Sequence, residues 1–552
     1  MVHIPLNRHV ISWCILICFT CGFYTTTLFA SPDYWPTNGW RSSTPEEQGM
    51  DSGKLIQMME MVRDEDYAID NITIIRNGYL VTDAYLYPFQ KNTKHVIHSN
   101  TKSITSALVG IALDKGYIKS VNQPVLEFFP EKTIANLNEQ KRSIALEHLL
   151  TMTSGLDTKD SYLYKWVGLG EMMRSEDWAQ YVLDLPMAQA PGKHFEYSNG
   201  VSYLLSAIIQ KATKMSALEF ARKHLFRPLG ITDVKWRTSP QGVNTGWGDM
   251  MLTPHDMAKI GLLYLNKGRW EDRQIVSTAW VEASTQKHIS ATLFDGYGYQ
   301  WWVDSAQYYM AVGYLGQFIF VVPEKNMVVV FTSNLEDYDF YIPKGLLDQY
   351  IIPAAVSSQP LVAQPKKKEH LDSLLANFAK APAQGFIWTS EKNGVAKNGE
   401  FIHTPSPAFR FKYPKTSLKQ AIRFPGQVMV MKTLGGNTFS ASISGIPTGT
   451  KLAEVGPSVF ASSLKNLGSN IQVVSNKKIT LEDGTVAYRT DINWLWQSSW
   501  SLRTLLVSAF KDRKLVGPVW VFLVYSLGAP NEASISEDLN EGASIVESLA
   551  FK

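Results

Sequence analysis

The sequence predicts an α+β protein in which two globular domains follow an N-terminal targeting segment. A chain of 552 residues is longer than one hydrophobic core usually serves. Strand-like segments over residues 72–86 and 308–334 flank a helix-rich middle, which favours one antiparallel sheet built from distant parts of the chain and packed against helices. Beyond residue 371 apolar and polar residues alternate, which predicts a second, smaller domain.

Residues 1–30 have the pattern of a secretory signal peptide. Arg8 precedes an apolar run from Val10 to Phe23, and the residues that follow predict cleavage near Ala30. The run is too short for a comfortable transmembrane span, although an uncleaved segment that anchors the chain in the inner membrane is the alternative. All three cysteines lie in this segment, which excludes disulfides and thiol chemistry from the rest of the chain. We therefore expect a periplasmic or secreted protein.

The first domain is expected over residues 31–357, and two helix starts are well marked within it. Thr44 is followed by proline and by Glu47, the pattern of a capped first turn. Thr253 is followed in the same way by proline and by Asp256. Asp256 is therefore interpreted as a carboxylate of a helix start rather than as a catalytic acid.

The second domain is expected over residues 371–552, after a linker over residues 358–370. The linker segment is polar, basic and contains prolines. Beyond it, Phe409, Phe411 and Tyr413 alternate with charged residues, as in a strand with one buried face. These features predict a C-terminal α+β accessory domain with a mostly antiparallel sheet.

Ser99 and Lys102 stand three residues apart at the start of a predicted helix, where Ile104 and Leu108 begin an apolar stripe that Gly116 ends. Ser99 then lies in the first turn, where free backbone N–H groups favour a developing negative charge. Lys102 lies one turn further on the same face. A serine becomes a good nucleophile when a neighbour takes its proton, and a lysine can do so when burial destabilises the ammonium. The alternative is a capping serine beside a solvated lysine.

Two further stretches accompany this pair. Tyr197 and Asn199 lie in "PGKHFEYSNG", directly before an apolar helix, and Gly313 and Gly316 lie in "VGYLG" between two strand runs. With Ser99 these motifs resemble those of the serine β-lactamase and penicillin-binding-protein superfamily, whose sites combine S-x-x-K, Y-x-N and a glycine-containing edge strand. The stretches "ALEHLLTMTSGLD", "YGYQWWV" and "GQFIFVVPEKNMVVV" look like class C β-lactamase-related hydrolases, nearest to the 6-aminohexanoate-dimer hydrolase and esterase branch.

The resemblance implies a β-lactamase/transpeptidase-like fold, an antiparallel sheet with a helical subdomain, and a role for each motif residue. Ser99 would form an acyl-enzyme, while Lys102 and Tyr197 would move its proton to the leaving group and later activate water. Asn199 would hold Lys102 or a substrate amide. The backbone N–H groups of Ser99 and Tyr314 would form the oxyanion hole.

The third motif departs from the family pattern, because it contains neither Lys-Thr-Gly nor His-x-Gly. The side chains that usually grip a β-lactam carboxylate are therefore absent from it, and a small ester or linear amide is the expected substrate. Tyr162, Tyr164 and Trp166 could line the acyl pocket, or they could be ordinary core residues. A true β-lactamase or D-amino-acid peptidase remains an alternative, as does a catalytically idle binding or sensor protein on the same fold.

Composition and motifs exclude several other classes. A net charge of +3 gives no electrostatic basis for binding nucleic acid or an anionic membrane, so the only membrane contact expected is through a retained signal segment. The sequence has no H-E-x-x-H metal motif, no G-x-S-x-G elbow and no phosphate-binding loop. We therefore expect neither a metal nor a cofactor.

Overall fold

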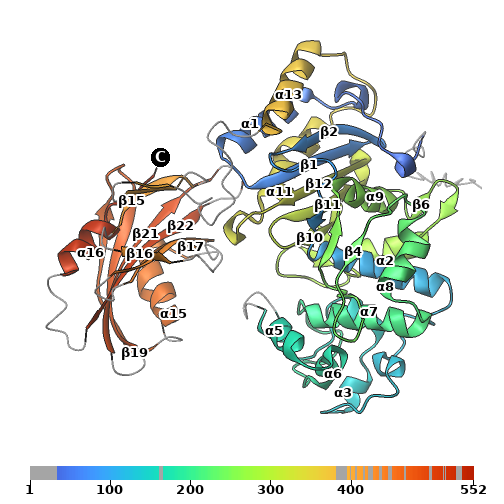
Figure 1. Ribbon diagram of the computed structural model, residues 1–552, viewed down its shortest axis with the longest axis horizontal. Coiled ribbons are helices and arrows are strands. Elements are labelled where there is room, and N and C mark those ends of the chain that lie inside the picture. The colour runs from blue at the N-terminus through green and yellow to red at the C-terminus, as the bar shows by residue number, and fades with distance from the viewer. Residues whose placement is uncertain are drawn as a thin grey trace, which may run out of the picture.

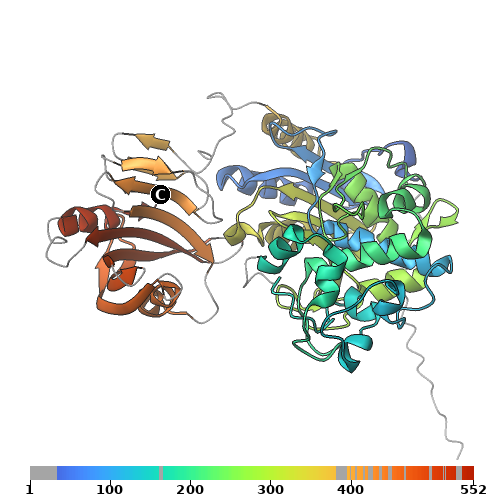
Figure 2. The same ribbon diagram turned by 60° about the horizontal axis from the view of Figure 1, so that its bottom comes forward.

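The computed structural model contains two units, which lie side by side in Figures 1 and 2. It describes residues 34–160, 166–380, 395–397, 400–403, 407–413, 417–420, 427–433, 438–445, 450–464, 468–496, 500–513, 515, 518–529 and 538–551. The predicted signal peptide over residues 1–30 lies outside these ranges, as do Tyr162 and Tyr164. In the described part of the chain, no helix combines the length and apolar character needed to cross a membrane.

The first unit is built on a seven-stranded antiparallel sheet whose strand order is β2-β1-β12-β11-β10-β9-β8. Its strands are β1 (Ile69–Arg76), β2 (Tyr79–Tyr85), β8 (Gly296–Tyr297), β9 (Trp302–Asp304), β10 (Tyr308–Gly313), β11 (Gln317–Val322) and β12 (Met327–Ser333). Strand β1 pairs with β12 although most of the unit's sequence separates them, for example through Ile72 and Phe331. The predicted sheet of distant segments is confirmed.

Helices surround this sheet and form a separate helical region below it in Figure 1. They are α1 (Ser52–Asp64), α2 (Asn100–Asp114), α3 (Glu139–Arg142), α4 (Leu146–Leu150), α5 (Val167–Arg174), α6 (Trp178–Asp184), α7 (Asn199–Thr213), α8 (Ala217–Ala221), α9 (Pro254–Leu265), α10 (Thr278–Thr285), α11 (Ile342–Leu346), α12 (Ile352–Ala354) and α13 (Pro365–Phe378). Helix α2 is central, and every residue from Asn100 to Ala112 is buried. It packs against α7 in the helical region and against β10 in the sheet. The fold class predicted from the sequence is confirmed.

One predicted helix start is correct and the other is displaced. Thr253 accepts a hydrogen bond from the backbone N–H of Asp256 at the start of α9. Thr44 and Glu47 do form the reciprocal capping bonds, but only a single 3₁₀ turn follows. Gly49 ends this turn at φ +69°, where a Cβ would lie 2.1 Å from the Ser357 carbonyl oxygen, so the chain must turn there. Helix α1 begins only afterwards.

Part of the segment predicted to be a linker, residues 358–370, is helical. Helix α13 begins at Pro365 and packs against α1 and β2. Its Leu371 and Leu374 are buried in the core of the first unit. The basic residues of its first turns resemble a linker, so the sequence did not indicate this helix. Because the helix packs on the core of the first unit, that unit extends beyond the predicted boundary at residue 357.

The C-terminal unit contains a second seven-stranded sheet of order β16-β17-β18-β22-β21-β20-β19 and a four-stranded sheet of order β13-β14-β15-β23. The strands are β13 (Val395–Lys397), β14 (Glu400–His403), β15 (Phe409–Lys412), β16 (Ser417–Gln420), β17 (Gln427–Thr433), β18 (Thr438–Gly445), β19 (Gly468–Thr480), β20 (Val486–Trp496), β21 (Trp500–Lys511), β22 (Val519–Ala529) and β23 (Ala550–Phe551). Helices α14 (Leu452–Glu454), α15 (Ala461–Leu464) and α16 (Asp538–Val546) accompany them. Phe409 and Phe411 are buried as their alternation predicted, so the accessory unit is α+β.

Side chains of the C-terminal unit contact the first unit where the two meet. Arg513 of the C-terminal unit is buried and forms an ion pair with Asp339, in the short helix η7 (Asp337–Asp339) of the first unit. Arg513 also donates to the Tyr338 carbonyl oxygen, and its guanidinium carbon lies 5.6 Å from the centre of the Tyr338 ring. Leu515 belongs to the core of the first unit and lies against Gly345. The accessory unit therefore contributes to the core of the first unit.

Arg513→Ala should lower the free energy of unfolding by about 3–5 kcal/mol, because it leaves the buried Asp339 carboxylate without its partner. Burial already raises the pKa of Asp339 to about 7, an effect that Arg513 opposes. The measurement is urea unfolding of the full chain. Arg410→Ala is the matched control, because Arg410 is half exposed and pairs with Glu400 at the surface, where less than about 1 kcal/mol is expected. Equal, small losses in both variants would contradict this account of the contact.

Candidate active site

Ser99 lies in the turn directly before α2, at the N-cap position. Its side chain makes no capping hydrogen bond. Instead, Lys102 Nζ donates to Ser99 Oγ over 3.1 Å. His98, the preceding residue, has φ +45°, an uncommon backbone conformation for a residue other than glycine that points to a constrained turn. The capping alternative weighed from the sequence therefore does not describe this hydroxyl.

Lys102 is only 1% exposed, and its ammonium group donates to three oxygen atoms. These are Ser99 Oγ at 3.1 Å, Asn199 Oδ1 at 2.7 Å and the Trp247 carbonyl oxygen at 3.1 Å. Burial lowers the pKa of Lys102, and the negative charges of Asp160 and Asp249 oppose this effect. The lysine is thus held against the serine and is able to lose its proton more readily than a surface lysine.

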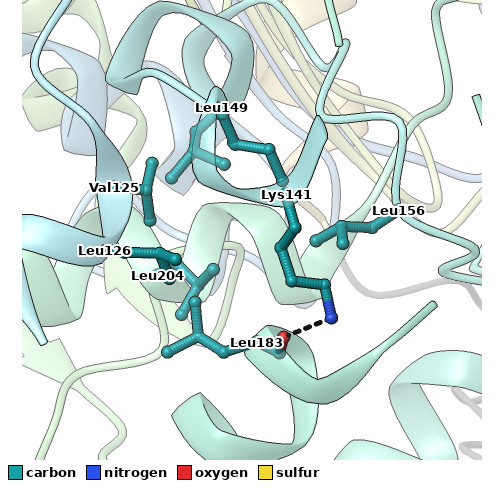
Figure 3. Close-up of a pocket in the computed structure, with 8 residues that line it drawn as sticks. Val125, Leu126, Lys141, Leu149, Leu156, Leu183 and Leu204 are labelled. Atoms are coloured by element: carbon teal, nitrogen blue, oxygen red, sulfur yellow. Dashed lines mark hydrogen bonds between the residues drawn. The ribbon is translucent and has the colours of Figure 1, made fainter. Parts of the chain in front are cut away.

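A second buried lysine shows what distinguishes Lys102. Lys141 is equally buried, and Figure 3 shows its side chain passing between leucines to the carbonyl oxygen of Leu183. Its Nζ donates to the Leu183 and Ala135 oxygens at 2.9 and 2.8 Å. Burial lowers the pKa of Lys141 as well. Its hydrogen-bond acceptors are backbone carbonyls, which have no proton to give, so Lys141 ties two segments together and has no nucleophile to activate.

Tyr197 lies beside Lys102, just before α7. The Lys102 ammonium lies 4.6 Å from the centre of the Tyr197 ring, and Trp302 stacks on that ring with centroids 5.7 Å apart. Burial raises the pKa of Tyr197, and a hydrogen bond with Ser99 partly offsets the rise. At neutral pH Tyr197 is therefore a protonated phenol, whereas burial favours the neutral form of Lys102.

Asn199 is the first residue of α7, which Ser198 caps by accepting from the Val201 N–H. Its side-chain oxygen accepts from Lys102, as noted above, while its backbone N–H donates to Asp160 Oδ2. The predicted role of Asn199 in holding Lys102 is consistent with this geometry. Asp160 was not predicted as a site residue.

The glycine strand lies against the turn that carries Ser99. A Cβ at Gly313 would lie 2.5 Å from the Ile97 carbonyl oxygen and 2.9 Å from Asn100 Nδ2. Asn100 Nδ2 donates to the Ile97 and Gln317 carbonyl oxygens at 2.9 and 3.1 Å, so it joins the serine turn to β11. The close approach requires glycine at position 313. It also puts Tyr314 beside the serine turn, with its ring edge-on to His98 at 5.8 Å.

Gly316 is required for its backbone conformation rather than for a close approach between strands. It has φ +86°, and a Cβ there would lie 2.7 Å from Leu335 Cδ1. The glycine therefore permits the tight turn between β10 and β11. Gln317 Nε2 donates to the Ser333 carbonyl oxygen at 2.6 Å and so ties this turn to the end of β12.

The family of the chain follows from a comparison with known families. The Beta-lactamase family matches residues 61–345, which span all three motifs. The chain belongs to the beta-lactamase family. The resemblance inferred from the motifs is confirmed.

Individual relatives differ in their activities. A 6-aminohexanoate-dimer hydrolase from Paenarthrobacter ureafaciens is 23% identical over 299 residues, which cover 50% of this chain and 75% of that protein. A monacolin J acid methylbutanoyltransferase from Aspergillus terreus is 27% identical over 170 residues, 28% of this chain and 40% of that protein. Among solved structures, a penicillin-binding protein from Bacillus halodurans aligns with a TM-score of 0.42 and 20% identity over 52% of this chain and 98% of that one.

The wall of this beta-lactamase-family site is aromatic. Trp166, predicted as a pocket residue, lies edge-on to Tyr197 with ring centroids 6.4 Å apart. Trp302 and Tyr297 also contact the Tyr197 ring, and neither was predicted as a pocket residue, although both stand in the "YGYQWWV" stretch that carried the family resemblance. No group of three or more metal-ligating side chains comes together within the described ranges.

Gly313→Ala should lower turnover by about 100-fold or more, because the new methyl group collides with the Ile97 backbone and must push the strand away from the serine. The measurement is kcat/KM on an ester that the parent protein hydrolyses. Gly445→Ala is the matched control, since a Cβ there meets nothing within 4 Å, and its activity should be unchanged. Normal activity in Gly313→Ala would show that the close approach is dispensable.

Proposed function

We propose that this protein is a serine hydrolase that acts through an acyl-enzyme on a small ester or a linear amide. The observation that carries the proposal is the buried Lys102 ammonium, hydrogen-bonded to the hydroxyl of Ser99 with the protonated Tyr197 beside both. A binding or sensor protein has no need of a lysine buried against a serine, because burial of an ammonium costs free energy. The arrangement therefore favours catalysis over the idle alternative.

The reaction follows from the chemistry of these groups. Neutral Lys102 takes the proton of Ser99 as the Oγ–carbon bond forms, and the backbone N–H groups of Ser99 and Tyr314 receive the developing negative charge. When the tetrahedral intermediate collapses, the bond to the leaving oxygen or nitrogen breaks. The proton on Lys102 reaches the leaving group through the Tyr197 hydroxyl. Water then attacks the acyl-enzyme with the same groups as base, and Ser99 recovers its proton.

The substrate class is inferred from what surrounds the nucleophile. Trp166 and Trp302 offer apolar ring surface beside Tyr197. The glycine strand lacks the lysine or histidine that would grip a β-lactam carboxylate. The hydrolase relative named for a 6-aminohexanoate dimer supports a linear amide, and the acyltransferase relative supports an ester. A true β-lactamase or D-amino-acid peptidase is the weaker candidate.

Export is part of the same proposal. The apolar run within residues 1–30 supports secretion or transfer to the periplasm, with anchoring in the inner membrane as the alternative. We propose no metal, cofactor or nucleic-acid partner, because the proposed acyl transfer needs only the side chains named above.

Ser99→Ala should abolish turnover, by several orders of magnitude, because it removes the attacking oxygen. The parent protein is tested against p-nitrophenyl esters, nitrocefin, a D-alanyl amide and a 6-aminohexanoate dimer, and a fluorophosphonate probe is used to map the reactive serine. We expect ester or linear-amide turnover and labelling at Ser99. Ser475→Ala is the control, since Ser475 and Lys478 form another S-x-x-K pair, on strand β19. Labelling at any serine other than Ser99 would overturn the assignment.

Lys102→Arg should be nearly inactive although it keeps the positive charge, because a guanidinium does not deprotonate in the working range of pH. In the parent protein, kcat/KM should rise with pH as Lys102 loses its proton, since only neutral lysine accepts the serine proton. Burial lowers the pKa of Lys102, so the increase in kcat/KM should occur at a lower pH than the pKa of an ordinary lysine. Rates across pH for both proteins test this. Parent-like turnover in Lys102→Arg would show that the lysine is not the base.

A further inference from the structure

Asp160 is a buried carboxylate that the proposed reaction does not use. It is 1% exposed and lies before α5, in the segment that follows the "TSGLD" stretch. Its Oδ1 accepts from the Leu169 N–H at 3.1 Å, and its Oδ2 accepts from the Asn199 N–H. Burying this carboxylate costs free energy, because a charge must be taken out of water. A role limited to joining two backbone segments does not account for that cost.

Asn199 connects Asp160 to Lys102. Its backbone N–H donates to Asp160 Oδ2, and its side-chain oxygen accepts from Lys102 Nζ at 2.7 Å. The carboxylate therefore holds the start of α7 where the Asn199 oxygen faces the lysine.

Charges around Lys102 come from each segment packed against it. Asp160 approaches from the segment before α5, Asp249 from the turn before β5 (Met250–Leu252), and Tyr197 from the residues before α7. His98 precedes α2 itself. Asp249 is one-third exposed and pairs with Arg237 at 3.6 Å, so solvent and a cation weaken its effect. Asp160 is the buried anion of the set.

We propose that Asp160 is a positioning residue of this site, which holds Asn199 where its side-chain oxygen accepts from Lys102 and whose negative charge governs how readily the ammonium releases its proton. The proposal rests on the proposed function and deepens it. Burial raises the pKa of Asp160, while Lys102 and the bonds from Asn199 lower it, so lysine and carboxyl titrate as a pair. An ionised Asp160 holds the proton on Lys102, and its loss frees the lysine at lower pH.

The test is the rate of fluorophosphonate labelling of Ser99 in the full chain, measured across pH. In Asp160→Asn the negative charge is gone, so the midpoint of the rise should move to lower pH by about one unit or more. Asp160→Ser removes the same charge with a smaller side chain and should give the same shift if Asp160→Asn does not fold. Asp160→Glu keeps the charge and should keep the midpoint of the parent protein, whatever its maximal rate.

Asp177→Asn is the matched control. Asp177 caps α6 by accepting from the Gln180 N–H at 2.9 Å, so the change removes a helix-capping carboxylate away from Lys102. It should leave the midpoint unchanged. Slower labelling of both neutral Asp160 variants at an unchanged midpoint would overturn the proposal and leave Asp160 a purely structural residue. An absence of labelling in the parent protein would instead refute the proposed function, and the role of Asp160 with it.

Discussion

The ammonium of Lys102 is taken out of water and satisfied by oxygen atoms from three separate parts of the chain, and the geometry of the site depends on this arrangement. A buried cation without such partners would be strongly destabilising. Helix α2, the start of α7 and the turn at Trp247 must therefore approach to hydrogen-bond distance. Because the same burial favours the neutral lysine, the interaction that fixes the fold locally also suits Lys102 to the proposed role of base.

The sheet and the helical region meet at Ser99 for a related reason. Helix α2 is buried along its length and touches both layers, so its first turn is fixed from two sides. Asn100 ties that turn to β11, and Gly313 lets β10 approach the backbone before Ser99. Neither residue takes part in proton transfer. They hold β10 and the turn before Ser99 closer together than a side chain at position 313 would permit.

The predicted site residues that the structure brings together are those whose pattern lies within a few positions of the sequence. Ser99 and Lys102 share one helical turn, and Tyr197 and Asn199 stand directly before a helix, so spacing alone brings each pair together. Asp160 could not be found in this way. It meets Asn199 only through the fold, and nothing in its local pattern separates it from Asp157, the other aspartate of "GLDTKD". Trp302 likewise reaches Tyr197 only because β9 lies at that side of the sheet.

Domain boundaries are hard to predict from composition, because composition indicates which segments are exposed but not which segments pack together. The basic start of α13 resembles a linker, yet its apolar face completes the core beside α1. Arg513 and Leu515 reach back into the first unit from a segment between two strands of the second. Phe340, which follows Asp339, packs on Phe318 of β11 and on Phe294, and Phe294 contacts Trp302. A continuous path of packed side chains therefore leads from the accessory unit to the ring that stacks on Tyr197. These contacts connect the accessory unit to the aromatic side chains beside Tyr197, and the boundary between the units is best drawn by them rather than by the polar segment between the two sheets.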